Sequence, residues 1–269
     1  MPLLTAILLG IVEGLTEYLP VSSTGHLVLV GHLLGLADDD PATSSFEIVI
    51  QLGAVLAVVA HYRTLLAVHA RGLLNGNPAS RQLVLALAVA FAPAAVVGLT
   101  LHKIIKAHLF GPLPVAAALV LGGVAMILVE RIRASRQTKG DVGLEHVTLR
   151  RALVIGLAQC LSLWPGTSRS MSTIIGGQLV GLSTATAAEF SFLLALPTLG
   201  AACLFEGFKA RHLLVSSIGI PSLIAGFLVS YFVAWAVIAS FLRYLRARGL
   251  EPFGWYRIVA GVIVLWVLT

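Results

Sequence analysis

The chain has 269 residues, of which 58% are hydrophobic and 11% are charged, and its mean hydropathy is +0.96. Soluble domains carry about 25% charged residues, so this composition excludes a water-soluble fold of this size. The formal net charge is +6. The Lys and Arg residues lie in short segments between apolar stretches, without interleaved aromatic residues. This pattern argues against nucleic-acid binding and is typical of cytoplasmic loops in membrane proteins.

The first apolar region covers residues 3–36, and its start does not resemble a cleavable signal peptide, because it has no basic segment and contains Glu13 and Glu17. The sequence Pro20-Val-Ser-Ser-Thr-Gly25 interrupts it. Each half has about 14–18 residues, which is short for a bilayer span. We therefore predict a re-entrant helical hairpin, whose irregular turn must be satisfied by protein or by a water-filled cavity.

Six further segments are long and apolar enough to cross a bilayer. They cover residues 46–62, 82–101, 112–130, 186–206, 218–242 and 254–269. Between the third and the fourth lies a second broken region, residues 149–181, interrupted by Pro165-Gly-Thr-Ser-Arg-Ser170. The predicted fold is a single all-α membrane domain over residues 1–269, with about six transmembrane helices and two re-entrant hairpins.

Loop charge predicts the orientation. If the loops 63–81, 131–151 and 243–257 face the cytoplasm, they hold thirteen of the eighteen Lys and Arg residues, and the opposite side holds four and the acidic run Asp38-Asp-Asp40. Such a bias places both termini outside. The one basic residue assigned to neither side is Arg169. The cytoplasmic set is Arg63, Arg71, Arg81, Arg131, Arg133, Arg136, Lys139, Arg150, Arg151, Arg243, Arg246, Arg248 and Arg257, and the outer set is Lys103, Lys106, Lys209 and Arg211.

The two halves of the chain resemble one another in the order of their elements. Residues 1–130 form repeat one, residues 131–148 a cytoplasmic linker and residues 149–269 repeat two, each repeat being a hairpin followed by three spans. Because three crossings separate the hairpins, they enter from opposite faces. This predicts an inverted-topology repeat, an arrangement of transporters whose sites lie at the repeat interface.

Glu13 and Glu17 are four residues apart and share one face of a helix. Ionisable side chains inside a membrane are costly and indicate function. Two carboxylates repel one another unless a cation or a proton intervenes, and carboxylate oxygens suit Mg²⁺ or Ca²⁺. The alternative is that both residues face a solvated vestibule and bind nothing.

The first break supplies hydroxyls and a histidine after Pro20. Ser22, Ser23, Thr24 and Gly25 precede or open the second helix of the hairpin, whose N-terminus favours phosphate. Ser23 lies three residues before His26, so Ser23 is a candidate nucleophile with His26 as its base. His26 is itself the alternative nucleophile. His32 stays unassigned, because a lone His on an apolar face is more often structural.

The second break places Arg169 among the hydroxyls of Thr167, Ser168 and Ser170. A buried guanidinium needs an anion and binds phosphate oxygens in a bidentate way. The alternative partner is a structural carboxylate, with Glu13, Glu17, Glu47 and Glu189 available. Carboxylates with a divalent cation, an Arg and helix N-termini are the equipment of phosphoryl transfer.

Two motifs carry a resemblance to a known family. They are Glu13-Gly-Leu-Thr-Glu17-Tyr-Leu-Pro-Val-Ser-Ser-Thr-Gly-His26 and Pro165-Gly-Thr-Ser-Arg169-Ser. Phe46-Glu-Ile-Val-Ile-Gln-Leu-Gly53 and Ala188-Glu-Phe-Ser-Phe-Leu-Leu-Ala-Leu-Pro197 agree with it in order and spacing. The chain resembles the bacterial undecaprenyl-diphosphate phosphatases of the bacitracin-resistance type over its whole length.

The resemblance implies a membrane hydrolase that converts undecaprenyl diphosphate to undecaprenyl phosphate for cell-wall synthesis. Overproduction of such enzymes confers bacitracin resistance, because bacitracin sequesters the diphosphate. The resemblance also implies a divalent cation and a site that opens to the outer, periplasmic side of the cytoplasmic membrane. The expected partners are the lipid substrate and the bilayer, with a homodimer left open.

The family's functional residues carry over to positions of this chain. The metal ligands are Glu13 and Glu17, and the catalytic residues are Glu17, Ser23, His26 and Arg169. The cation is expected to be Mg²⁺, with Ca²⁺ as the alternative. The nucleophile is Ser23, His26 or an activated water. One departure is Met171, where the family commonly has Gly, which predicts either a less close backbone approach to phosphate or a side chain along the lipid groove.

A function of another class fits the repeat architecture, namely a transporter or flippase of polyprenyl phosphates. Two carboxylates without a cation would repel an anionic substrate, so they give no advantage to a carrier of anions. The pair of Glu13 and Glu17 beside Ser23 and His26 therefore favours the phosphatase.

Overall fold

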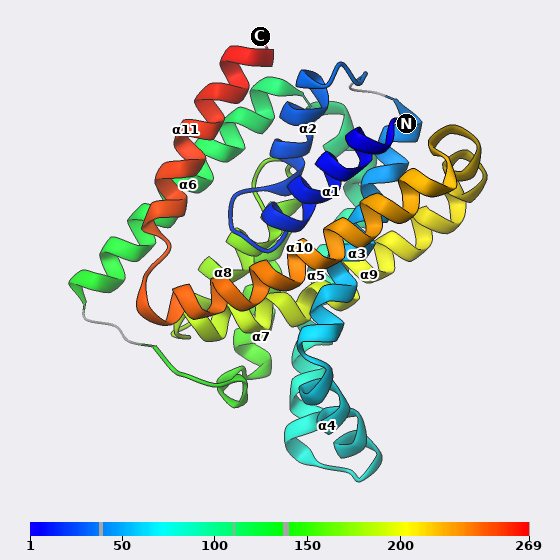
Figure 1. Cartoon of the computed structure of the whole chain (residues 1–269). Coiled ribbons are helices and arrows are strands. Elements are labelled where there is room, and N and C mark those ends of the chain that lie inside the picture. The colour runs from blue at the N-terminus through cyan, green and yellow to red at the C-terminus, as the bar shows by residue number, and fades with distance from the viewer. Residues whose placement is uncertain (38–39, 110, 137–139, 269) are drawn as a thin grey trace.

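The computed structural model describes residues 1–37, 40–109, 111–136 and 140–268 (Figure 1). Asp38, Asp39 and Lys139, which entered the charge prediction, lie outside these residues, as do the side chains of Lys103 and Lys106.

Regular structure in the described residues is helical, apart from an isolated β-bridge between Asp141 and Leu182. Short 3-10 segments cover Leu144–His146 and Cys160–Leu163, and a π-helical turn covers Leu214–Ile218. The α-helices are α1 (Leu3–Thr16), α2 (Ser23–Leu33), α3 (Pro41–His61), α4 (Arg63–Leu74), α5 (Pro78–Leu109), α6 (Pro112–Ser135), α7 (Leu149–Gln159), α8 (Arg169–Leu179), α9 (Thr184–Leu213), α10 (Ile220–Ala247) and α11 (Glu251–Leu268).

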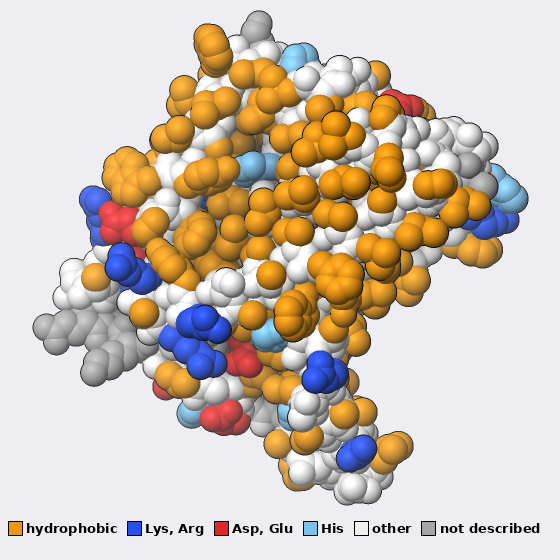
Figure 2. All heavy atoms as spheres, viewed as in Figure 1, with side chains coloured by type: hydrophobic (Ala, Val, Ile, Leu, Met, Phe, Trp, Pro, Cys, Tyr) orange, Lys and Arg blue, Asp and Glu red, His pale blue; other side chains and the backbone are white. Residues whose placement is uncertain are grey.

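Six helices are long and apolar enough to cross a membrane, namely α3, α5, α6, α9, α10 and α11. They match the six predicted spans in order, so the prediction of an all-α membrane protein is confirmed. Exposed hydrophobic side chains cover the surface formed by these helices (Figure 2). The prediction was wrong at residues 63–81, where α4 replaces part of the expected loop. Its residues 63–71 contain neither Pro nor Gly, so the helix can form there, and α4 projects from the bundle in Figure 1.

Helix starts follow from local capping. The side chain of Asp40 accepts hydrogen bonds from the amides of Ala42 and Thr43 and opens α3. Thr148 caps α7 and Ser183 caps α9 in the same way. Each cap satisfies backbone donors that have no partner inside the helix, and it fixes where the apolar segment begins.

The two broken regions have the same backbone at the turn. Ser22 and Ser168 are the non-glycine residues with positive φ in the described chain, both at 74°. Each is the N-cap of the helix that follows, and each side chain accepts the backbone N–H three residues on, of Gly25 and of Met171. The two turns therefore present their helix N-termini in matching ways.

Helix packing also pairs the halves. The first helix of each broken region packs on a long helix of the other half, α1 on α10 and α7 on α5. The contacts are close, because a Cβ on Gly10 would lie 2.6 Å from the carbonyl oxygen of Gly226, and one on Gly156 would overlap that of Ala90. Helices α3 and α9 pack together in the interior, and α6 packs on α11. This packing brings both breaks to the interior.

Candidate active site

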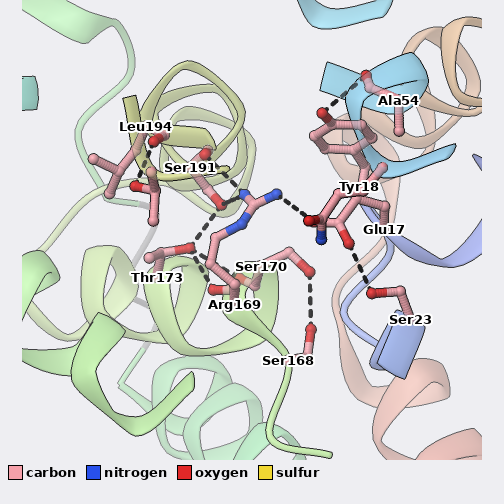
Figure 3. A network of polar contacts seen from close by, with 12 residues as sticks. Glu17, Tyr18, Ser23, Ala54, Ser168, Arg169, Ser170, Thr173, Ser191 and Leu194 are labelled. Atoms are coloured by element: carbon pink, nitrogen blue, oxygen red, sulfur yellow. Dashed lines mark hydrogen bonds and ion pairs between the residues drawn. The ribbon is translucent and has the colours of Figure 1, made fainter. Parts of the chain in front are cut away.

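The two breaks are in direct contact. The hydroxyl of Ser170, in the first turn of α8, donates a hydrogen bond of 2.9 Å to the carbonyl of Leu19. Residues predicted from separate motifs therefore lie side by side (Figure 3).

Glu17 is the centre of this contact. One carboxylate oxygen, Oε1, lies 3.0 Å from Nη2 of Arg169, and the other, Oε2, accepts a hydrogen bond of 2.7 Å from the hydroxyl of Ser23. Glu17 and Arg169 are buried, with exposed fractions of 5% and 8%. A charge-assisted bond in such surroundings is strong, because water does not compete for either partner.

Arg169 is held from several sides. Its Nη1 donates to the carbonyl and to the hydroxyl of Ser191 in α9, at 2.9 and 3.1 Å. Its guanidinium lies 5.5 Å from the ring centroid of Tyr18. Its Nε is buried and has no hydrogen-bond partner among the described residues. Arg169 thus has the structural carboxylate partner that was the alternative, namely Glu17, while its Nε has no hydrogen-bond partner among the described residues.

Glu13 lies one turn before Glu17 and is 1% exposed. Its Oε1 has no hydrogen-bond partner in the described part of the chain. Electrostatic interactions link its carboxyl to those of Glu17 and Glu47. No cluster of three or more His, Cys, Asp or Glu side chains suited to a metal occurs among the described residues. Two carboxylates fit Mg²⁺ nonetheless, because this ion commonly binds one or two carboxylates, water and substrate phosphates.

The remaining hydroxyl residues of the prediction lie around the same contact. Ser168 lies 3.0 Å from the Ser170 hydroxyl, oxygen to oxygen. Thr167 is buried in the turn before it, where its amide donates to the carbonyl of Trp164. On the other side, Ser22 and Gly25 are buried and form the cap of α2, while Thr24 is exposed.

His26 makes contacts that the sequence did not predict. Its Nδ1 lies 2.7 Å from the carbonyl oxygen of Ser22, and its Nε2 lies 2.7 Å from the hydroxyl of Tyr256 in α11. The hydroxyl of Ser23 is directed to Glu17 instead. The residue in contact with Ser23 that can take up its proton is therefore Glu17, which sequence spacing alone did not indicate.

Arg257 does not lie in the cytoplasmic loop that the distribution of loop charge predicted. The sequence analysis placed it in a cytoplasmic loop, but it lies within α11 and is 0% exposed. The assignment was wrong because residues 251–268 form one helix that contains this Arg. Its guanidinium donates to carbonyls of both breaks, Pro20 and Gly166, at 3.1 and 2.9 Å. Two further carbonyls, of Ala118 and Leu119 in α6, complete its partners. The sequence feature that could have indicated a helical position for Arg257 is the unbroken apolar run that follows it.

Met171, the departure from the family motif, is buried in the core and 4% exposed. A Cβ on Gly122 of α6 would lie 2.9 Å from its Cε and would overlap the guanidinium of Arg257. Gly122 therefore leaves the space that both side chains use.

Comparison with known proteins identifies the family of this chain. Residues 6–263 match the family model described as bacitracin resistance protein BacA. The chain belongs to the BacA family. This confirms the resemblance noted from the two motifs, both of which lie within the matched residues.

Named relatives of this BacA chain share most of its length. It is 61% identical over 263 residues to an undecaprenyl-diphosphatase of Sorangium cellulosum, which covers 97% of this chain and 85% of the relative. It is 46% identical to undecaprenyl-diphosphatase 2 of Rhodospirillum rubrum, covering 98% and 94% of the two chains. An undecaprenyl-diphosphatase of Thermoanaerobacter pseudethanolicus is 45% identical, with 98% and 96% covered.

Proposed function

We propose that this chain hydrolyses undecaprenyl diphosphate to undecaprenyl phosphate and phosphate. The observation that carries the proposal is the carboxylate of Glu17, which is bonded to Arg169 on one side and to the Ser23 hydroxyl on the other. In this group of contacts Ser23 would serve as the nucleophile, Glu17 as its proton acceptor and Arg169 as the cation that binds phosphate. The names of relatives at 45–61% identity support the substrate.

The terminal phosphate would bind where the two breaks meet. Arg169 offers its unpartnered Nε, and the N-termini of α2 and α8 offer backbone N–H groups. Glu13 and Glu17 would hold a divalent cation, which when bound neutralises charge on the phosphate oxygens. The free Oε1 of Glu13 supports this assignment.

In the proposed reaction the Ser23 oxygen forms a bond to the terminal phosphorus as the bridging P–O bond breaks. Undecaprenyl phosphate leaves with that electron pair, and the Ser23 proton passes to Oε2 of Glu17, to which it is already hydrogen-bonded. Water then attacks the phosphoserine, releasing phosphate and restoring Ser23. As the phosphoserine P–O bond breaks, Glu17 returns its proton to the Ser23 oxygen, and His26 takes up the proton of the water. Attack by His26 or directly by water are the alternatives that trapping experiments distinguish.

An apolar cleft of about 510 Å³ lies beside the first break. Leu15 of α1 and Leu19 in the turn after it form one wall, and the carbonyl of Leu19 accepts the hydrogen bond from Ser170. The other wall comes from α10 and from Phe253 of α11. Hydrophobic side chains line the hollow between α11 and the α1–α10 pair in Figure 2. The position and the apolar lining suit the first isoprene units of the substrate.

For topology we propose the inverted repeat of residues 1–130 and 149–269, joined by the cytoplasmic linker, with both broken regions re-entrant. The matching turns at Ser22 and Ser168 and the reciprocal packing of α1 on α10 and α7 on α5 support it. Figure 1 shows α4, the described end of the linker at residues 140–148 and the α10–α11 turn at the end of the molecule opposite both termini. The basic residues of these segments favour the cytoplasmic side for that end, so the site would open to the periplasmic side of the inner membrane.

The test is phosphate release from undecaprenyl diphosphate by the purified full chain in detergent. We expect release with Mg²⁺, its loss with EDTA and its recovery when Mg²⁺ is restored. Release that EDTA leaves unchanged would overturn the cation assignment at Glu13 and Glu17. A folded wild-type protein that releases no phosphate would overturn the proposed function and favour transport of polyprenyl phosphates.

A further inference from the structure

Helix α11 brings Tyr256 against His26, 230 residues away in the chain. The phenolic oxygen lies 2.7 Å from Nε2 of His26. The two rings are nearly parallel, with 3° between their planes and 5.6 Å between their centroids. Tyr256 therefore contacts the imidazole through both its hydroxyl and its ring.

The contact of the other ring nitrogen, Nδ1, determines the direction of the hydrogen bond between Tyr256 and Nε2. Nδ1 of His26 lies 2.7 Å from the carbonyl oxygen of Ser22, and a carbonyl oxygen can only accept a hydrogen bond. Nδ1 must then carry the proton. In the neutral imidazole Nε2 has the lone pair, so it accepts from the Tyr256 hydroxyl. Nε2 is consequently the one nitrogen of His26 that can take up a proton.

The backbone beneath Tyr256 is anchored, while its side chain is accessible. The next residue, Arg257, is fully buried and donates to four carbonyls, two of which belong to the breaks. Tyr256 itself is 49% exposed. The hydrogen bonds of Arg257, called here the Arg257 clamp, thus fix the position of Tyr256 relative to the first break. The exposed phenol can contact water or substrate.

We propose that Tyr256 is a positioning residue for His26. A phenol both donates and accepts hydrogen bonds, so it bonds to neutral Nε2 as a donor and to protonated Nε2 as an acceptor. The imidazole keeps one orientation before and after it takes up a proton, and Nε2 stays directed to the same side of the site. The role rests on the proposed hydrolysis, in which the attacking water gives its proton to the Tyr256 oxygen while the phenolic proton moves along the existing hydrogen bond to Nε2 of His26.

The experiment combines kinetics with nitrogen-15 NMR of histidine-labelled full-length protein in detergent micelles. In Tyr256→Phe the ring contact remains and the hydroxyl is lost. We expect kcat to fall about fivefold to tenfold, the factor that one neutral hydrogen bond supports, with KM changed less than twofold. The Nε2 resonance of His26, assigned by its loss in His26→Gln, moves to the position of a nitrogen without a hydrogen bond. Tyr231→Phe, which changes a tyrosine of α10, should alter neither kcat nor the Nε2 resonance.

A double-mutant cycle separates positioning from a structural role. If Tyr256 acts through His26, Tyr256→Phe has no further effect on the rate that remains in His26→Gln. An equal loss in both backgrounds, or an unchanged Nε2 resonance in Tyr256→Phe, would overturn the proposal. The NMR measurement needs no turnover. An inactive wild type would therefore count against the proposed function, while the resonance would still decide whether Tyr256 holds His26.

Discussion

Glu17 and Arg169 are 152 residues apart in the chain and form a buried ion pair of 3.0 Å. The same carboxylate accepts the hydroxyl of Ser23. One side chain of the first break therefore joins a cation of the second break to a potential nucleophile. The pair should affect both the stability of the fold and the rate of phosphate release, and variants can separate these two effects.

Removing one partner of the pair should destabilise the fold. Arg169→Met leaves Glu17 buried without its cation, and we expect a loss of about 3–5 kcal/mol in the free energy of unfolding. Replacing both, as Glu17→Leu with Arg169→Met, should be less destabilising than the sum of the two single changes. Unfolding in detergent, followed by circular dichroism, measures this.

The two single variants and the double variant should all release no phosphate. Activity in the double variant would show that the pair serves packing alone. Additive losses of stability would contradict the direct coupling of the two side chains.

Ser23→Ala should lower the rate of phosphate release by about a thousandfold or more, because it removes the proposed nucleophile. Brief reaction with labelled substrate followed by acid quenching should place phosphate on Ser23 in the wild type. Ser135→Ala is the matched control, since Ser135 is exposed at the end of α6 and its hydroxyl donates to the carbonyl of Ile132. Label on His26, or a rate retained in Ser23→Ala, would assign the attack elsewhere.

The positive φ at Ser168 predicts that Gly is a more stable replacement than Ala there, which is the reverse of the order inside a helix. Both Ser168→Gly and Ser168→Ala lose the cap on Met171, but only Gly adopts a φ of 74° without strain. Ser168→Gly should therefore be more stable than Ser168→Ala by about 1 kcal/mol. At Ser240, exposed within α10, Ala should be the more stable by about 0.5–1 kcal/mol. The same order at both positions would refute the strained turn.

Gly122→Ala should impair the site without touching the substrate. Its Cβ would overlap the guanidinium of Arg257, which cannot move without breaking bonds to both breaks. We expect a loss of about 1–3 kcal/mol in stability and a fall in activity. Gly207→Ala in α9, where a Cβ would meet nothing within 4 Å, should be neutral or stabilising. Equal behaviour of the two variants in thermal unfolding would argue against the Arg257 clamp.

The spans and the two breaks follow directly from the sequence. Runs of about 20 apolar residues leave little choice of structure in a bilayer, and Pro20 and Pro165 lie where such runs stop. The membrane helices could be predicted for this reason, and the family could be predicted from the two motifs. The turn conformation at Ser22 and Ser168 could not, because nothing in the residue type requires a positive φ there.

Partners across the chain were harder to predict than the residues themselves. Arg169 had four candidate carboxylates in the sequence, and only the contact of the start of α8 with the turn that follows α1 selects Glu17. Spacing suggested His26 for Ser23, because residues three apart share a helix face. The turn at Ser22 instead brings Glu17 to Ser23, and α11 brings Tyr256 to His26. The contact between Tyr256 and His26 depends on helices from opposite ends of the chain.

The most direct test of the central claim is the rate of phosphate release from undecaprenyl diphosphate by Glu17→Gln, measured against wild type with Mg²⁺ present. The amide keeps the size of the side chain but removes the charge that pairs with Arg169 and the oxygen that receives the Ser23 proton. We predict a folded protein, shown by circular dichroism, with release reduced at least about a thousandfold. Release within tenfold of wild type would contradict the proposed site.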